Sequence, residues 1–426
     1  MSSTILEWIS FESFGRHLSD EEAESLCIQI GRILSSSSVQ VLAIDICNLS
    51  ARCFLNLASG LRRNSDSKLQ SLILEWALED SSAVKHVADM MNSATRLETL
   101  SLGHLGAMEE EYVGILSRAL IHRSSLKELK LEEVEWGAAL LLQALAGDHG
   151  NQSIERLYLT EVDGLGGCLR EVLTSNPSLK EVRLSSVEMS PEEWHQLGEV
   201  IRDKDRATNI EINFHWGDEW ESIEALVCAA SSEVKDPTVK LELCPSNENE
   251  CMLSLNLLGR VLRGEIKSLK SISILASLDT SGTNQDRPQC ILSMNGKTGE
   301  TSVLKQLQLF VPSYDLWNDL LLCLRGNTSL IHLDLSGFYL EEEAFRDLMG
   351  LLQVNLTLQE INVSGTSWAS DGKAALIEEA LKQNQKRQDS ITSNPYEDSL
   401  RQKLGWKEMG AIVEDSRHGS EALGKK

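Results

Sequence analysis

The chain has 426 residues, with 40 lysines and arginines against 64 aspartates and glutamates, which gives a formal net charge of −24 at pH 7. A chain of this charge repels phosphate backbones and anionic membrane surfaces, so nucleic-acid binding and membrane association are not expected. Its composition, 42% hydrophobic and 24% charged, is typical of a folded protein, and no apolar run approaches the roughly 20 residues that span a bilayer.

The N-terminal residues predict a helical cap. The start, MSSTILEWISFESF, has Glu7 and Glu12 where a secretory signal needs a basic start and an unbroken apolar run, so we expect a cytoplasmic protein, with the nucleus as the alternative. The stretch LSDEEAESLCIQIGRIL offers Ser19 or Asp20 as a helix N-cap and apolar residues at helical spacing. Residues 1–38 are therefore predicted to form a helical lid for the array that follows.

From residue 39 onward the chain repeats a short apolar pattern, LxxLxL. Twelve copies begin 25 to 35 residues apart, a spacing too regular for accident. The clear copies are Leu69-Leu72-Leu74, Leu97-Leu100-Leu102, Leu126-Leu129-Leu131, Ile154-Leu157-Leu159, Leu179-Val182-Leu184, Leu269-Ile272-Ile274, Leu304-Leu307-Leu309, Leu330-Leu333-Leu335 and Leu358-Ile361-Val363. The weaker copies are Val39-Leu42-Ile44, Ala207-Ile210-Ile212 and Thr238-Leu241-Leu243.

Each repeat predicts one short strand and one helix. In LKELKL at 126–131, alternation places the last two leucines on one face of a strand, and Glu128 and Lys130 on the other. In SPEEWHQLGEVIR at 190–202, Ser190 and Glu193 form a capping box around Pro191. Units of this size cannot bury their apolar faces alone, so neighbours must stack. We predict an α/β solenoid with parallel strands on the concave face and helices on the convex face.

The pattern resembles the leucine-rich repeat of the ribonuclease-inhibitor type over about residues 39–386. The resemblance implies a horseshoe of about 12 repeats spanning 39–387, with an insertion near 279–300 that suggests a hairpin at Asn295-Gly296. The asparagine usual after the strand in that family is mostly absent, and Cys47 and Asp163 are candidate replacements.

The C-terminal part predicts a closing helix and a tail. A helix over 372–385 completes the last repeat, KQNQKRQDSITSNP has loop composition, and 388–426 is predicted as a tail or linker. Asn-x-Ser/Thr triplets at Asn48, Asn151, Asn327, Asn355 and Asn362 are interpreted as chance or turn asparagines.

A search for catalytic chemistry finds no site. The stretches at 295–298 and 365–374 fail the GxxxxGK[ST] spacing that cradles phosphates, and the histidines have no metal-ligand spacing. The nine cysteines lack CxxC pairs and are interpreted as small buried hydrophobic residues. We therefore expect no enzyme activity, cofactor or metal site.

The remaining candidate is the concave surface, formed by strand positions between the buried leucines. Trp216 fits an exposed anchor and a core residue equally well, whereas Trp220 fits the core better. The strand positions predicted to face outward are Glu75, Trp76, Ser101, His104, Glu128, Lys130, Glu132, Arg156, Tyr158, Thr160, Glu181, Arg183, Glu211, Asn213, Phe214, Trp216, Gln306, Gln308, Phe310, His332, Asp334 and Asn362. The residues predicted to bind a protein are Trp76, Tyr158, Arg183, Phe214, Trp216 and Phe310.

These observations predict a non-catalytic protein-interaction scaffold. Its acidity favours a protein partner with a basic patch. The resemblance implies an alternative: the recognition or autoinhibitory region of a larger signalling GTPase or ATPase, as in plant Roco-like and NLR-like proteins, with the nucleotide switch outside these residues.

Overall fold

The computed structural model describes residues 7–12, 18–36, 38–78, 81–105, 109–134, 137–203, 208–214, 220–231, 238–276, 292, 301–310, 316–336 and 342–392. Within them, 13 parallel strands form one sheet in chain order. The strands are β1 Trp8–Glu12, β2 Val41–Asp45, β3 Ser71–Glu75, β4 Thr99–Gly103, β5 Glu128–Glu132, β6 Arg156–Thr160, β7 Glu181–Ser185, β8 Asn209–Phe214, β9 Val239–Leu243, β10 Leu269–Leu275, β11 Gln306–Phe310, β12 His332–Asp334 and β13 Glu360–Asn362.

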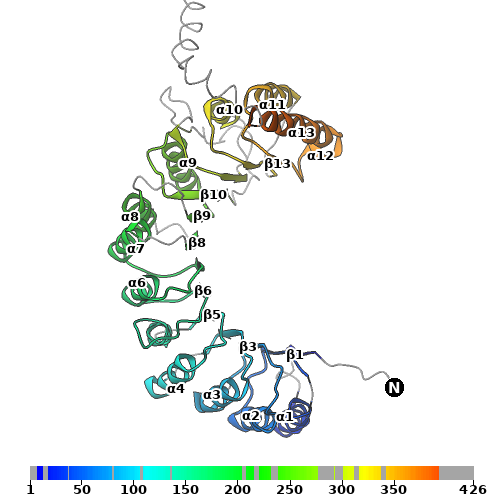
Figure 1. Cartoon of the computed structure of the whole chain (residues 1–426), viewed down its shortest axis with the longest axis vertical. Coiled ribbons are helices and arrows are strands. Elements are labelled where there is room, and N and C mark those ends of the chain that lie inside the picture. The colour runs from blue at the N-terminus through cyan, green and yellow to red at the C-terminus, as the bar shows by residue number, and fades with distance from the viewer. Residues whose placement is uncertain are drawn as a thin grey trace, which may run out of the picture.

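Helices alternate with the strands and form a second, outer layer. Figure 1 shows an open arc whose inner face is the sheet and whose outer face is the row of helices, which confirms the predicted α/β solenoid. The helices are α1 Asp20–Leu34, α2 Ala51–Arg63, α3 Val84–Ser93, α4 Glu110–Ile121, α5 Gly137–Gln143, α6 Gly166–Ser175, α7 Pro191–Asp203, α8 Trp220–Ala230, α9 Glu248–Leu262, α10 Leu316–Gly326, α11 Glu342–Val354, α12 Ser367–Ser370 and α13 Lys373–Thr392.

The repeated apolar residues form one continuous core between the two layers. Leu72 pairs in register with Leu100, and Leu100 with Leu129, and all three side chains are fully buried. Burying one leucine contributes about 1.5–3 kcal/mol relative to leaving it exposed. Because each repeat adds two or three such side chains against the next, stacking supplies the stability that a single repeat lacks.

The register of the sheet slips by two residues between β8 and β9. The repeat pattern aligns Ile210 with Leu241, whereas the structure pairs Ile212 with Leu241 and Phe214 with Leu243. β8 carries a third inward side chain at Phe214, so the next strand pairs two positions further along. A two-residue slip keeps every side chain on its original face, which is why the core tolerates it.

The N-terminal segment contains a strand that the sequence did not predict. β1 pairs in parallel with β2, and its Ile9 and Phe11 are half-buried against the core. The predicted helix follows as α1, and Ser19 caps it with a complete capping box to Glu22. Residues 1–38 therefore add a first strand to the sheet as well as a helix to the outer layer. The predicted capping box at Ser190 and Glu193 is also present, at the start of α7.

Buried asparagines link several neighbouring repeats near the ends of their helices. Asn355 donates from Nδ2 to the Leu324 and Asn327 carbonyls of the preceding repeat, at 2.7 and 3.2 Å. Its Oδ1 accepts from the Thr357 and Leu358 amides at 3.0 and 3.1 Å. Asn151 and Asn384 bridge their preceding repeats in the same way. Three of the Asn-x-Ser/Thr triplets, at Asn151, Asn327 and Asn355, are thus buried structural asparagines.

Cys47 and Asp163, proposed to replace the usual asparagine after the strand, differ in burial. The buried Cys47 thiol lies 3.0 Å from the Asp45 carbonyl of its own repeat and 3.7 Å from the Phe11 carbonyl of the preceding one, so it can link neighbouring repeats. Asp163 is exposed, so the second proposed replacement is wrong.

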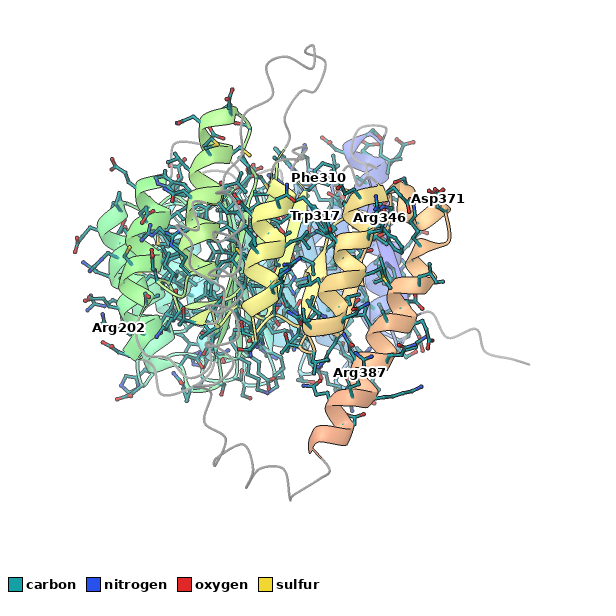
Figure 2. The ribbon with its side chains drawn as sticks, turned by 90° about the horizontal axis from the view of Figure 1, so that it is seen from above. Arg202, Phe310, Trp317, Arg346, Asp371 and Arg387 are labelled. Atoms are coloured by element: carbon teal, nitrogen blue, oxygen red, sulfur yellow. The ribbon has the colours of Figure 1, made fainter. Side chains whose placement is uncertain are left out.

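At the C-terminal end, α13 runs to Thr392, past the predicted end at Gln385. Figure 2 shows α13 projecting beyond the ends of α10 and α11, with Arg387 on the projecting part. The polar stretch is rich in lysine, glutamine and arginine, which are good helix formers, and its first proline is Pro395. The suggested hairpin at Asn295-Gly296 lies outside the described residues, as do 393–426.

Candidate functional site on the concave face

The outward positions of neighbouring strands line up in rows across the concave face. Strand pairing sets the middle row directly, because each residue lies beside its counterpart in the next repeat. From β3 to β9 this row is Ile73, Ser101, Lys130, Tyr158, Arg183, Glu211 and Lys240. Two of the predicted binding residues, Tyr158 and Arg183, are therefore direct neighbours.

Tyr158 lies between two cations. Lys130 Nζ is 5.3 Å and Arg183 Cζ 5.1 Å from the centre of its ring. Such cation–π contacts contribute about 0.5–1 kcal/mol at exposed sites and hold the ring in place. Burial, followed by the nearby Glu181 and Glu128 carboxylates, raises the pKa of Tyr158 above its ordinary value, so the ring stays neutral.

Ion pairs neutralise the centre of the face around Tyr158. Glu128 accepts from Arg156 at 2.7 Å and lies 3.1 Å from Lys130. Arg183 is 2.8 Å from Glu181 and 3.7 Å from Glu211, and Glu211 also lies 3.7 Å from Lys240. Four cations thus alternate with three carboxylates, so this part of the face is not acidic although the chain as a whole is.

A second feature follows the strands at the edge of the face. The residue directly after each of six consecutive strands has a left-handed backbone, with φ between 49° and 52° at Trp76, His104 and Glu161. This conformation costs roughly 1–2 kcal/mol in a non-glycine residue. It keeps the amide paired to the next repeat: Trp76 N donates to the Gly103 carbonyl at 3.2 Å, and His104 N to the Glu132 carbonyl at 2.9 Å. The full row is Ile46, Trp76, His104, Glu133, Glu161 and Ser186.

Trp76 is presented to solvent on this edge. Its side chain is 48% exposed and stacks on His104, with ring centroids 4.0 Å apart and planes at 21°. His104 Nδ1 lies 2.7 Å from Glu133 Oε2, which holds the imidazole in place. We call this surface the Trp76 patch, and it consists of Glu75, Trp76, His104, Glu132, Glu133 and Glu161.

The carboxylates of the Trp76 patch lack strong counter-charges. Burial, then the neighbouring Glu75 carboxylate, raises the pKa of Glu132; His104 opposes the shift, and Glu133 and Glu161 add to it. Among the described residues, no lysine or arginine forms an ion pair with Glu75, Glu132, Glu133 or Glu161, and the His104 imidazole is the basic side chain that contacts Glu132 and Glu133. This edge therefore holds negative charge that a basic group from outside can neutralise.

The electrostatic difference between the two surfaces predicts opposite mutational effects. Glu132→Gln is expected to raise the melting temperature at pH 7, because it removes a charge that partial burial, and then repulsion by Glu75, disfavours in the folded state. The gain should fade as the pH drops through the raised pKa toward 4.5, since Glu132 is then neutral in both states. Thermal melts at pH 7 and pH 4 test this.

Glu128→Gln is the matched control. Burial alone would raise the pKa of Glu128, but hydrogen bonds from Arg156 and Lys130 bring it below its ordinary value. This substitution should therefore lower the melting temperature at pH 7. Equal effects of the two substitutions at pH 7 would contradict the assignment of repulsion to the Trp76 patch.

The predicted binding residues have three different outcomes. Phe214 is only 4% exposed and packs against Trp194, with ring centroids 5.1 Å apart, so its assignment as a binding residue was wrong. Trp216 lies outside the described residues. Phe310 is 48% exposed at the end of β11, far along the arc from Trp76 and Tyr158. Trp76 and Tyr158 are three strands apart, and Trp76 lies three residues further along the chain than Ile73, the counterpart of Tyr158.

Sequence reasoning missed Glu133 and Glu161 as surface residues of the site. Both follow the last leucine of their repeat by two positions, as Trp76 and His104 do. That fixed offset is the sequence signal from which this row of residues could have been predicted.

Together, the fold and this open face define the class of protein: a leucine-rich-repeat-like α/β solenoid with a solvent-facing concave sheet. A scan against protein-family models finds no match, and a search of curated proteins finds none. No helix within the described ranges is long and apolar enough to cross a membrane. In the same part of the chain, no three histidine, cysteine, aspartate or glutamate side chains are grouped to hold a metal ion.

Proposed function

We propose that this chain is a non-catalytic scaffold that binds a protein partner through its concave face. One observation carries the proposal: an exposed tryptophan, held by stacking on His104, lies on an open sheet among carboxylates without strong counter-charges. Rigid aromatic side chains of this kind act as anchors in protein interfaces, because they bury a large area at little entropic cost.

The partner is expected to bring a basic patch to this edge. A lysine or arginine placed over Trp76 gains both cation–π attraction and the charge of Glu132 and Glu133. The ion-paired centre around Tyr158 then offers a second, charge-balanced contact area. The partner therefore needs basic residues only where it contacts the Trp76 patch, and not along the whole concave face.

The repeats are further proposed to be of the ribonuclease-inhibitor type, because their 25- to 35-residue spacing accommodates a helix in most units. The Roco-like or NLR-like alternative, in which the array is the recognition or autoinhibitory region of a larger signalling GTPase or ATPase, stays a prediction from the resemblance. In that setting the same face supplies the contact.

Site-specific photo-crosslinking tests the proposal. A benzophenone amino acid replaces Thr160 on the concave face or, as a control, Arg170 on the outer helix α6, and the intact chain is irradiated in native lysate at low salt. The Thr160 position is expected to give a discrete adduct that weakens as salt is raised, and the Arg170 position is not. Adducts that are the same at both positions, or absent from Thr160, would overturn the proposal.

A variant of Trp76 assigns the contact to the patch. Trp76→Gly removes the ring and suits the left-handed backbone, so the fold should be retained. It is expected to weaken partner binding by about 30-fold, the size of an interface hot spot. The control Leu322→Ala truncates a side chain that is 59% exposed on α10 and should leave binding unchanged.

A further inference from the structure

Three cysteines converge in the first two repeats. Cys27 on α1, Cys47 after β2 and Cys53 on α2 are all buried. Cys27 and Cys53 lie close enough for each thiol to shift the pKa of the other. Cys27 and Cys47 also line an apolar cavity of about 20 Å³ beneath Phe11 and Leu26. A space of that size admits one water-sized molecule.

Two glycines bring the helices carrying Cys27 and Cys53 into backbone contact. A Cβ on Gly31 would lie 2.5 Å from the Asn56 carbonyl oxygen, and one on Gly60 would lie 2.6 Å from the Gly31 Cα. Cys27 is one turn before Gly31, and Cys53 is two turns before Gly60. The closeness of the two thiols is therefore built into the α1–α2 contact.

The two thiols differ in reactivity. Cys53 is the third residue of α2, where the N-terminal end of the helix favours a thiolate, and the Ser50 hydroxyl donates to its sulfur at 3.5 Å. The neighbouring Cys27 thiol lowers the pKa of Cys53 to about 6, against the opposing effect of burial. The Cys53 thiol, together with burial, raises the pKa of Cys27. Since the helix N-terminus and the Ser50 hydroxyl both act on Cys53, it is assigned as the nucleophile of the pair and Cys27 as its partner.

We propose that Cys27 and Cys53 are an oxidant-sensitive pair that closes to a disulfide in the presence of hydrogen peroxide. The Cys53 thiolate attacks one peroxide oxygen, the O–O bond breaks, and the departing hydroxide takes up a proton to leave as water. The resulting sulfenic acid on Cys53 is attacked by Cys27 sulfur. The S–S bond forms as the S–O bond breaks, and the hydroxide leaves with the Cys27 proton as a second water. Two thiols are oxidised and one peroxide is reduced.

The burial of the pair selects the oxidant. Cys53 is 1% and Cys27 3% exposed, so a bulky disulfide such as oxidised glutathione cannot approach for exchange, whereas peroxide is close to water in size. The new bond would tie α1 to α2 across 26 residues of sequence and restrict the unfolded chain, so the oxidised protein should melt at a higher temperature.

The test uses the full chain, treated with hydrogen peroxide under native conditions, then alkylated in denaturant and digested for mass spectrometry. The expected product is a peptide pair joined through Cys27 and Cys53, two mass units lighter than the sum of the free peptides. Cys323 should stay reduced and therefore be alkylated, because burial, followed by Asp319, raises its pKa to about 12.

Variants separate the two roles. Cys27→Ser should leave Cys53 as a sulfenic acid that dimedone traps, and Cys53→Ser should slow the oxidation of Cys27 by at least 10-fold. Full alkylation of Cys27 and Cys53 under conditions that oxidise the exposed Cys228 would overturn the proposal, and so would a Cys27–Cys47 disulfide in place of the expected one. The measurement on the unmodified chain decides the matter even if a variant fails to fold.

Discussion

Asn355→Ala is expected to lower the free energy of unfolding by about 3–5 kcal/mol, one of the largest effects of any polar substitution in this chain. The side chain is only 3% exposed and makes five hydrogen bonds, one of them with the Thr357 hydroxyl. Alanine would take one donor from each of the two carbonyls and would leave the Thr357 and Leu358 amides without their acceptor, each amide costing roughly 1–3 kcal/mol if it stays buried. Chemical denaturation monitored by circular dichroism measures the loss.

Asn92→Ala is the matched control for this prediction. Asn92 is exposed on α3, and its hydrogen bond to Arg123 uses the main-chain carbonyl, which the substitution leaves in place. Its effect should stay within about 0.5 kcal/mol, as is usual for surface positions. If Asn355→Ala were no more destabilising than Asn92→Ala, the buried asparagines would not be a source of stability.

Gly60→Ala is expected to destabilise the protein by about 1–3 kcal/mol through overpacking. An added Cβ would overlap the Gly31 carbonyl oxygen and come within 2.6 Å of its Cα, so α1 and α2 must move apart. Backbone atoms cannot rotate away as a flexible side chain can. Since the same contact holds Cys27 beside Cys53, this variant should also form their disulfide more slowly.

Gly350→Ala provides a comparison of opposite sign. Gly350 lies within α11, and a Cβ there would meet no atom within 4 Å. Alanine should stabilise the helix by about 0.5–1 kcal/mol, because glycine loses more backbone freedom on folding. Thermal and urea unfolding of the two variants give the signs directly. Destabilisation by both would point to a general intolerance of alanine and away from the α1–α2 contact.

The core and the order of elements could be predicted from sequence because both depend on local spacing. Alternation within LKELKL assigns Leu129 and Leu131 to the core side of β5, and helical spacing around Trp194 assigns α7. Repeating the unit then leaves stacking as the one way to bury both apolar faces. The same logic placed Tyr158 and Arg183 on the solvent-facing, concave side of the sheet, where they are direct neighbours.

Phe214 shows where the local reasoning failed. Its position after Ile212 continues the inward alternation of β8, but whether a third inward residue is covered depends on the strand beside it. The two-residue slip against β9 supplies that cover. No spacing within one repeat contains this information, because register is a property of two strands.

Whether a carboxylate of the site has a counter-charge also depends on contacts between repeats. Glu128 and Glu132 belong to one strand, yet Glu128 is paired with Arg156 of the next repeat and Glu132 faces Glu75 and Glu161 of others. Net charge alone predicted a partner with a basic patch. The structure instead separates a neutralised centre from an acidic edge.

By itself, the sequence determined that this protein is a solenoid of about 12 leucine-rich-repeat-like units, since periodic apolar residues leave no other way to exclude water. The tertiary structure decided what the surface of that solenoid presents: the strand register, the left-handed row that exposes Trp76, the buried asparagines and the contact that brings Cys27 to Cys53. Each of these joins residues about 25 to 30 positions apart, and their distances are set by how one repeat packs on the next.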